Sequence, residues 1–178
     1  DQAVSDAYNA IVEKNPHLEN KEMVAEAVGI GAIIFNDLKN ERNLNVDFNL
    51  ENMLKFEGQT GPYLQYSSVR IASILKDNVI DLNLFDESHF NEDHYFNILK
   101  KLAQFPQTIK RSIDQYQPSV LAKYLISLAQ EFNHFYGRQR IIVDDNNHFN
   151  TNLALVAAVR ETLNEGMRIL GIKALNEM

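Results

Sequence analysis

The stretch FEGQTGPYLQYSSVR, residues 56–70, places two tyrosines and an arginine where a loop is expected to become a helix. Pro62 suits the first turn of that helix. Tyr63, Tyr66 and Arg70 are spaced i, i+3 and i+7, so they fall on one side of it. Phenol rings can stack on planar groups and a guanidinium can hold an anion, and unpaired RNA bases with their phosphates need both. These residue types have the chemistry that an RNA-binding face would need.

The other side of this predicted helix is apolar. Leu64, Ile71 and Leu75 recur at i, i+7 and i+11, which places them on a side that faces the core. The tyrosines then lie off this side, next to the small residues Ser67 and Ser73. Tyrosines in such a position also pack against a neighbouring helix with their hydroxyl groups at its rim. From the residue types alone, packing is the more common arrangement, and RNA binding is the alternative.

Helical periodicity dominates the chain and strand alternation is scarce, so we expect an all-α fold. Asn20 and Thr151 are the expected N-caps of two helices. Gly137 and Gly171 are expected to follow the last turns of two long helices. The expected helices cover roughly residues 1–15, 20–39, 50–55, 62–77, 91–104, 106–116, 118–136 and 151–170.

The acidic charge is concentrated in the first third of the chain. The net charge is −7; residues 1–58 carry 5 Lys and Arg against 11 Asp and Glu, whereas residues 59–178 carry 12 against 13. The overall acidity argues against a large basic surface for nucleic acid, but the balanced remainder leaves room for a local one. Gly29 and Gly31 interrupt a predicted helix of the acidic segment and indicate close packing against a neighbour.

The composition also bears on the cellular compartment. The sequence contains no cysteine, which excludes disulfides and thiolate metal sites and fits a reducing compartment. No apolar run approaches the ~20 residues that a membrane span needs, and no signal-peptide pattern opens the sequence. We therefore expect a cytoplasmic protein without a membrane partner. Because the first residue is Asp1 and not Met, we expect the sequence to be part of a longer chain.

Long stretches of the sequence resemble class I arginyl-tRNA synthetases. FEGQTGPYLQYSSVR resembles the segment at which the catalytic body of these enzymes joins their anticodon-binding helical bundle. The family's stretch just before this junction resembles AEAVGIGAIIFNDLKNERNLNVDFNLENMLKFEG of this sequence. Two long helices of the family's C-terminal DALR bundle resemble LAKYLISLAQEFNHFYG and LALVAAVRETLNEGMRILGI of this sequence. The resemblance covers nearly the whole chain and is weakest in residues 76–117. The junction motif is long and specific to the family.

This resemblance implies a fold, a function and a set of contact residues. It implies an all-α, DALR-type anticodon-binding bundle at residues 59–178, preceded by a short helical segment, residues 1–58, from the end of the catalytic body. In the family, the full enzyme joins arginine to its tRNA with ATP, and the bundle grips the anticodon stem-loop. The implied partners are arginine tRNA and the catalytic body of the same chain. The residues implied to contact the anticodon loop are Tyr63, Tyr66, Arg70, Tyr136 and Met178.

Two motifs with which class I synthetases bind ATP are missing from the sequence. No H-x-G-H occurs, and no credible KMSKS-like loop is present. We therefore expect this chain to lack the ATP and arginine sites, to bind no cofactor and to be non-catalytic alone, while the parent enzyme uses ATP with magnesium. An alternative function stays open: an acidic helical protein-interaction scaffold without RNA binding, in which the tyrosine side meets a partner helix.

Two histidines occur in the acidic stretch DESHFNEDHYF. His89 and His94 are accompanied by Asp86, Glu87 and Asp93. A metal site is conceivable from these residue types, but an i, i+5 spacing does not align two histidines on one helix face. We therefore expect a solvated loop here and no metal site.

Overall fold

A computed structural model describes residues 1–91 and 93–178, and the expected all-α fold is confirmed in this part of the chain. The α-helices are α1 (Gln2–Lys14), α2 (Lys21–Leu38), α3 (Leu50–Met53), α4 (Gly61–Leu75), α5 (Asp93–Ala103), α6 (Phe105–Asp114), α7 (Pro118–Arg138) and α8 (Asn146–Ile169). Two short 3₁₀ segments, η1 (Leu82–Leu84) and η2 (Glu87–Asn91), lie between α4 and α5.

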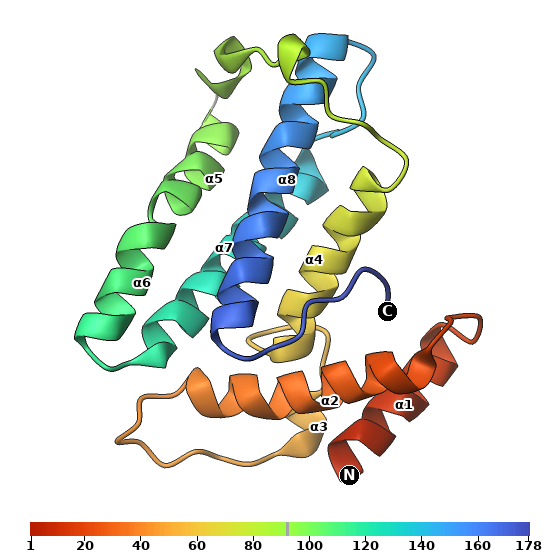
Figure 1. Cartoon of the computed structure of the whole chain (residues 1–178), viewed down its shortest axis with the longest axis vertical. Coiled ribbons are helices and arrows are strands. Elements are labelled where there is room, and N and C mark those ends of the chain that lie inside the picture. Colours follow the sequence, from red (N-terminus) through yellow and green to blue (C-terminus); the bar gives the residue numbers. More distant parts are fainter. Residues whose placement is uncertain (92) are drawn as a thin grey trace.

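Helices α4 to α8 form an elongated bundle, and α1 and α2 lie across one end of it (Figure 1). Within the bundle, α4, α7 and α8 contact one another, α5 contacts α7 and α8, and α6 packs against α7. α2 contacts α1, α4 and α7, so it joins the first helices to the bundle. After α8 the chain turns back, and its C-terminal end lies near α4 and α1 (Figure 1).

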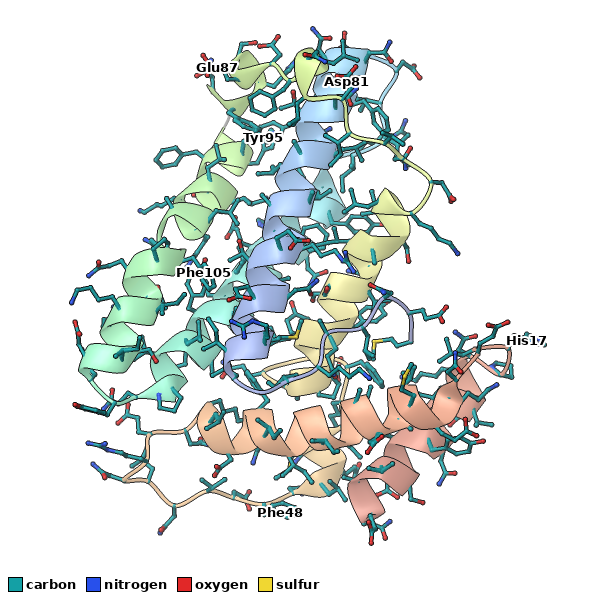
Figure 2. All side chains as sticks on the ribbon, in the orientation of Figure 1. His17, Phe48, Asp81, Glu87, Tyr95 and Phe105 are labelled. Atoms are coloured by element: carbon teal, nitrogen blue, oxygen red, sulfur yellow. The ribbon has the colours of Figure 1, made fainter. Side chains whose placement is uncertain are left out.

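The main core lies between the bundle helices. From α7 it takes the apolar stripe that the sequence predicts, because the following residues are all buried: Leu121, Tyr124, Leu125, Leu128 and Phe132. α5 and α8 supply the facing residues. Tyr95 of α5 points into the space between these two helices (Figure 2). Periodicity alone therefore identifies the buried side of α7.

A second, smaller core joins α1, α2 and the C-terminal tail. Ile11 of α1, Val28 of α2 and Leu175 of the tail are buried in it. A Cβ atom added at Gly29 would lie 2.8 Å from backbone atoms of Ala3, so α1 and α2 approach too closely for a side chain there. The close packing that Gly29 indicates is therefore confirmed.

The start of α8 differs from the expectation. α8 begins at Asn146, because Asp145 is the N-cap and its carboxylate accepts a backbone N–H of the first turn at 2.7 Å. Thr151, the expected cap, lies inside the helix. Its hydroxyl oxygen accepts the backbone N–H of Asp86 at 2.9 Å instead. The expectation was wrong because Thr151 serves a contact between distant segments and not a local one.

Other helix ends agree with the expectation in part. Gly171 follows α8 with φ +77°, as expected for a left-handed closing residue. Gly137 instead lies inside α7, because the last turn closes at Gln139, whose N–H bonds the carbonyl of Phe135 at 2.8 Å. Asn20 does precede α2, but it has φ 55° and its side chain makes no capping hydrogen bond.

Tyr124 on α7 leads to a prediction for alkaline pH. Its hydroxyl donates to the carbonyl of Lys101 at 2.7 Å, and burial raises the pKa of Tyr124 from 10.0 to about 12. Between these two values the unfolded chain loses this proton while the folded chain keeps it. The free energy of unfolding should therefore decrease as the pH rises through this window. Tyr124→Phe should make the decrease shallower.

Urea unfolding measured from about pH 9 to pH 12 checks this prediction. Tyr116→Phe is the matched control, because Tyr116 is 76% exposed. The Tyr124→Phe and Tyr116→Phe curves should differ in slope above about pH 10. Parallel curves for both variants and the unsubstituted chain would contradict the prediction.

Candidate nucleic-acid interface

The first turn of α4 is fixed by its cap and by close contact with α2. The Thr60 side chain accepts the N–H of Tyr63 at 3.1 Å, and its hydroxyl donates to the carbonyl of Lys55 at 2.6 Å. A Cβ atom added at Gly61 would lie 2.6 Å from the carbonyl oxygen of Gly31. This contact confirms the close packing expected at Gly31. It also fixes the position from which the first tyrosines of α4 project.

The apolar side of α4 lies where the sequence predicts it. Leu64 and Ile71 are fully buried and Leu75 packs against the main core at its edge. Tyr66 is exposed, as expected for a side chain off the core. Tyr63 is half-buried and packs against the main core. The expected separation of the two sides is therefore wrong for Tyr63, because α7 packs against α4.

Three of the expected contact residues meet around one guanidinium. The Cζ atom of Arg70 lies 4.9 Å from the ring centre of Tyr66 and 5.1 Å from the ring centre of Tyr136. Both distances are within the range of a cation–π interaction. Nη2 of Arg70 also donates to the hydroxyl of Tyr66 at 3.3 Å. α4 and α7 thus bring together residues that lie far apart in the sequence.

Asn133 connects Tyr63 to this group. Its side-chain nitrogen Nδ2 donates to the Tyr63 hydroxyl at 3.0 Å and to Ser67 Oγ at 2.9 Å, and its oxygen accepts from Nη1 of Arg70. Sequence reasoning missed Asn133. The available signal was its i, i+3 spacing to Tyr136, which places both on one side of α7.

Met178 lies close to the end of α1. Its backbone carbonyl accepts from the side chain of Asn15 at 3.4 Å. Met178 and Tyr66 line a pocket of about 460 Å³ together with Phe56 and Lys14. The Phe56 ring meets the Tyr66 ring edge-on at 6.3 Å, and Lys14 Nζ lies 4.9 Å from the Phe56 ring centre. The sequence analysis did not select Phe56 or Lys14.

These contacts form one continuous row, which we call the ring row: Lys14, Phe56, Tyr66, Arg70 and Tyr136. Its two ends differ in charge. At the Lys14 end it borders a second pocket, in which the four carboxylates of Asp6, Glu13, Glu51 and Glu57 outnumber the two amines of Lys14 and Lys55. Carboxylates repel phosphate, so an anionic ligand is favoured at the Arg70 end. At that end Tyr66 and Tyr136 are 38% and 42% exposed, and both rings contact the guanidinium.

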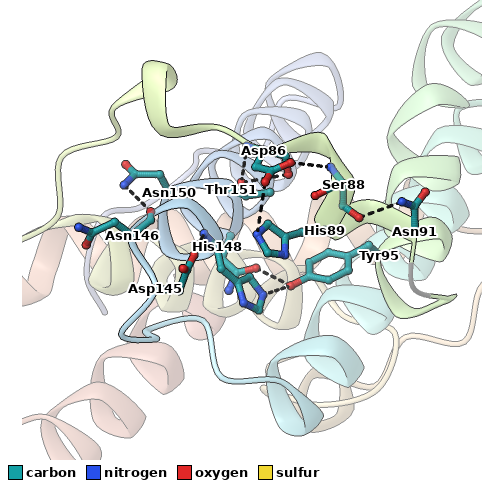
Figure 3. Close-up of polar contacts among 11 residues, drawn as sticks. Asp86, Ser88, His89, Asn91, Tyr95, Asp145, Asn146, His148, Asn150 and Thr151 are labelled. Carbon is teal, nitrogen blue, oxygen red and sulfur yellow. Dashed lines mark hydrogen bonds and ion pairs between the residues drawn. The ribbon is translucent and has the colours of Figure 1, made fainter.

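The histidines of the acidic stretch do not converge on one point. The His89 ring stacks on the His148 ring at 4.4 Å and its Nε2 lies 3.9 Å from a carboxylate oxygen of Asp86 (Figure 3). His94 packs instead against the rings of Tyr95 and Phe135. The expectation of a solvated loop was wrong for these two side chains, because both make ring contacts with the bundle.

Figure 3 also shows the hydroxyl of Tyr95 directed towards His148. Its hydroxyl donates to Asn152 Oδ1 at 2.8 Å and lies 2.7 Å from His148 Nε2. Asp93 was included in the candidate metal group, but its side chain lies outside the described part of the structure. Among the described residues, no group of three or more His, Asp or Glu side chains is placed to hold a metal ion.

A family model supports the identity that the junction motif implies. Residues 64–178 match the DALR anticodon binding domain. The chain belongs to this family. The match includes α7, α8 and most of α4, and it therefore contains four of the five expected contact residues: Tyr66, Arg70, Tyr136 and Met178.

Curated relatives extend the match over the whole chain. The arginine–tRNA ligase of Ligilactobacillus salivarius is 50% identical over 179 residues, and arginine–tRNA ligase 2 of Bacillus anthracis is 46% identical over 180 residues. Both alignments cover 100% of this chain, which spans 31% of the length of each relative.

Solved structures agree with the fold. Arginyl-tRNA synthetase from Thermus thermophilus superimposes with a TM-score of 0.90 at 30% identity, and this likeness covers 99% of the chain and 31% of the enzyme. Arginyl-tRNA synthetase from Plasmodium falciparum superimposes with a TM-score of 0.88 at 22% identity, which shows the same fold. In the part of the chain that the structure describes, no helix has the length and apolar character of a membrane span.

Proposed function

We propose that this chain is the anticodon-binding, C-terminal portion of an arginine–tRNA ligase and that it binds the anticodon stem-loop of arginine tRNA. The observation that carries the proposal is the arrangement around Arg70, whose guanidinium lies between two exposed tyrosine rings. The family match and the relatives' names support the choice of tRNA as the ligand.

Each expected contact residue has a chemical role in this proposal. Tyr66 and Tyr136 stack on unpaired bases of the anticodon loop, because their rings are exposed and held by the guanidinium between them. Arg70 contacts a phosphate or a base edge. Met178 supplies an apolar wall beside Tyr66. The half-buried Tyr63 presents its hydroxyl at the border of the same surface.

The chemical reaction belongs to the rest of the ligase in this proposal. The chain corresponds to about a third of its relatives, and it lacks the motifs with which the family binds ATP. We expect ATP, magnesium and arginine to be bound by the catalytic body, to which residues 1–58 connect the bundle at residues 59–178. The site of action is expected to be the cytoplasm, where the tRNA is found.

Salt-dependent binding to tRNA tests this function. Fluorescence anisotropy with labelled arginine tRNA should give an affinity whose logarithm falls linearly with the logarithm of the salt concentration, by ~0.7 for each loop phosphate that the protein neutralises. The same tRNA with its anticodon bases replaced is the matched control and should bind more weakly. The purified chain should also show no ATP–pyrophosphate exchange with arginine and tRNA.

Three results would contradict the proposal. Equal affinity for both tRNAs would show that the chain does not recognise the anticodon bases. No measurable tRNA binding, together with tight and salt-insensitive binding of a helical protein partner, would favour the acidic scaffold instead. Exchange activity that copurifies with the chain, and that persists when host synthetase has been removed, would show that the chain contains its own ATP site.

A further inference from the structure

We propose that Asn133 is a positioning residue of the RNA site: its side-chain amide holds the Arg70 guanidinium between Tyr66 and Tyr136 without cancelling the positive charge. The proposal rests on the proposed function, because it describes how Arg70 is presented to RNA. Asn133 lies half-buried on α7, whereas Arg70 lies on α4. The contact between them therefore depends on how the two helices pack.

The hydrogen bonds around Asn133 permit one orientation of its amide. Ser67 Oγ donates its hydrogen to the backbone carbonyl of Tyr63 at 2.8 Å. Towards Asn133 this oxygen can only accept, so the nitrogen Nδ2 must lie on that side, 2.9 Å away. Nδ2 also donates to the Tyr63 hydroxyl at 3.0 Å. The oxygen Oδ1 consequently faces Arg70 and accepts from Nη1.

This orientation fixes the plane of the guanidinium. A free arginine side chain occupies many rotamers, and a ligand that binds it must order it at an entropic cost. Here one nitrogen of Arg70 is bound by Asn133 and the other donates to the Tyr66 hydroxyl at 3.3 Å. A guanidinium has five N–H donors, so these two bonds leave three for a phosphate or a base edge.

An amide suits this role better than a carboxylate. Aspartate at position 133 would also bond Arg70, but it would neutralise the guanidinium and repel RNA phosphates. The neutral Asn133 orients the cation and leaves its charge available. A residue that only links α4 to α7 would not need to be neutral. The two roles can therefore be separated by experiment.

The first test uses the free chain and needs no RNA. Nitrogen-15 NMR spectra of the Arg70 guanidinium should show separate, slowly exchanging Nη signals, because two hydrogen bonds hinder its rotation. In Asn133→Ala these signals should merge into an averaged one. An averaged signal in the unsubstituted chain would overturn the proposal, whatever the result with RNA.

The second test asks whether Asn133 acts through Arg70. Asn133→Ala should lower the affinity for arginine tRNA roughly 2- to 12-fold, the range that corresponds to one net hydrogen bond. In an Arg70→Ala background the same substitution should have less than about a twofold effect, because its target is gone. If Asn133→Ala lowers the affinity by the same factor with Arg70 present and in the Arg70→Ala background, the proposal is overturned. If Arg70→Ala binds arginine tRNA like the unsubstituted chain, Arg70 lies outside the RNA site and the positioning role of Asn133 is overturned, whereas loss of anticodon-dependent binding in the unsubstituted chain would overturn the proposed function.

The third test separates charge from packing. Asn133→Asp has the same shape but lacks the two N–H donors of Nδ2, so the Tyr63 and Ser67 hydroxyls must turn to donate to the new carboxylate. The variant should stay folded, as its melting curve checks, and should lose at least as much affinity for arginine tRNA as Asn133→Ala. Asn164→Asp is the matched control, because Asn164 of α8 links to α4 by accepting the Ser68 hydroxyl at 2.6 Å. It should bind tRNA nearly as well as the unsubstituted chain. Unchanged affinity in Asn133→Asp would show that Asn133 is only a structural link.

Discussion

Tyr66→Ala should weaken the binding of arginine tRNA by ~1–3 kcal/mol, the range found when a ring that stacks on an unpaired base is removed. This corresponds to roughly a 5- to 150-fold rise in the dissociation constant. Tyr66 is the exposed tyrosine of α4, and its ring contacts both Phe56 and the guanidinium of Arg70. The substitution therefore removes a stacking surface and one of the groups that hold the guanidinium.

Tyr116→Ala is the matched control for this measurement. Tyr116 is also exposed, but it lies between α6 and α7 and outside the ring row. Its substitution should leave the affinity unchanged. Melting temperatures of both variants should stay close to that of the unsubstituted chain, because neither ring is buried. If Tyr66→Ala stays folded and binds arginine tRNA with unchanged affinity, Tyr66 does not belong to the site.

Arg70→Ala extends the same experiment to the kind of contact that the guanidinium makes. If Arg70 holds a phosphate, all tRNAs should bind more weakly by a similar factor and the salt slope should fall by about one unit. If it contacts a base edge, the affinity for arginine tRNA should fall more than the affinity for other tRNAs, so the preference for arginine tRNA should become smaller. For Tyr63 the informative variant is Tyr63→Phe, because Tyr63 packs against the core and alanine would also remove that packing.

Leu128→Ala should lower the free energy of unfolding by ~2–5 kcal/mol. Leu128 lies on α7 in the main core and is fully buried, with 0% of its surface exposed. Truncation removes apolar contacts and leaves a cavity that the surrounding helices fill only in part. The expected loss is large because α7 contacts α4, α5, α6 and α8, so the cavity affects most of the bundle.

Urea unfolding measures this loss, and Leu82→Ala provides the comparison. Leu82 lies in η1 and is 72% exposed, so the same change of side chain should alter the stability by less than about 0.5 kcal/mol. Binding of arginine tRNA by the folded fraction of Leu128→Ala should stay near the unsubstituted value. A loss of stability for Leu128→Ala as small as that for Leu82→Ala would show that Leu128 does not occupy a packed core position.

The sequence alone determined the features that depend on neighbours along one helix. The stripe that contains Leu121 and Leu128 follows the period of the α-helix, and burial on that side bears it out. The spacing of Tyr66 and Arg70 likewise placed them together on α4, where they are in contact. Such relations are local because residues three or four apart are neighbours on any helix. The family resemblance added Tyr136 and Met178, which no spacing within α4 could indicate.

Only the tertiary structure decided which distant side chains meet. Arg70 and Asn133 are separated by 63 positions, and their contact exists because α4 and α7 pack side by side. The same packing made Tyr63 partly a core residue, and a contact with Asp86 placed Thr151 inside α8 rather than at its cap. Helical periodicity specifies which side of a helix is apolar, but it does not specify which helix covers that side or in what register. The surface around Arg70 follows from that packing, because no single helix contains all of its residues.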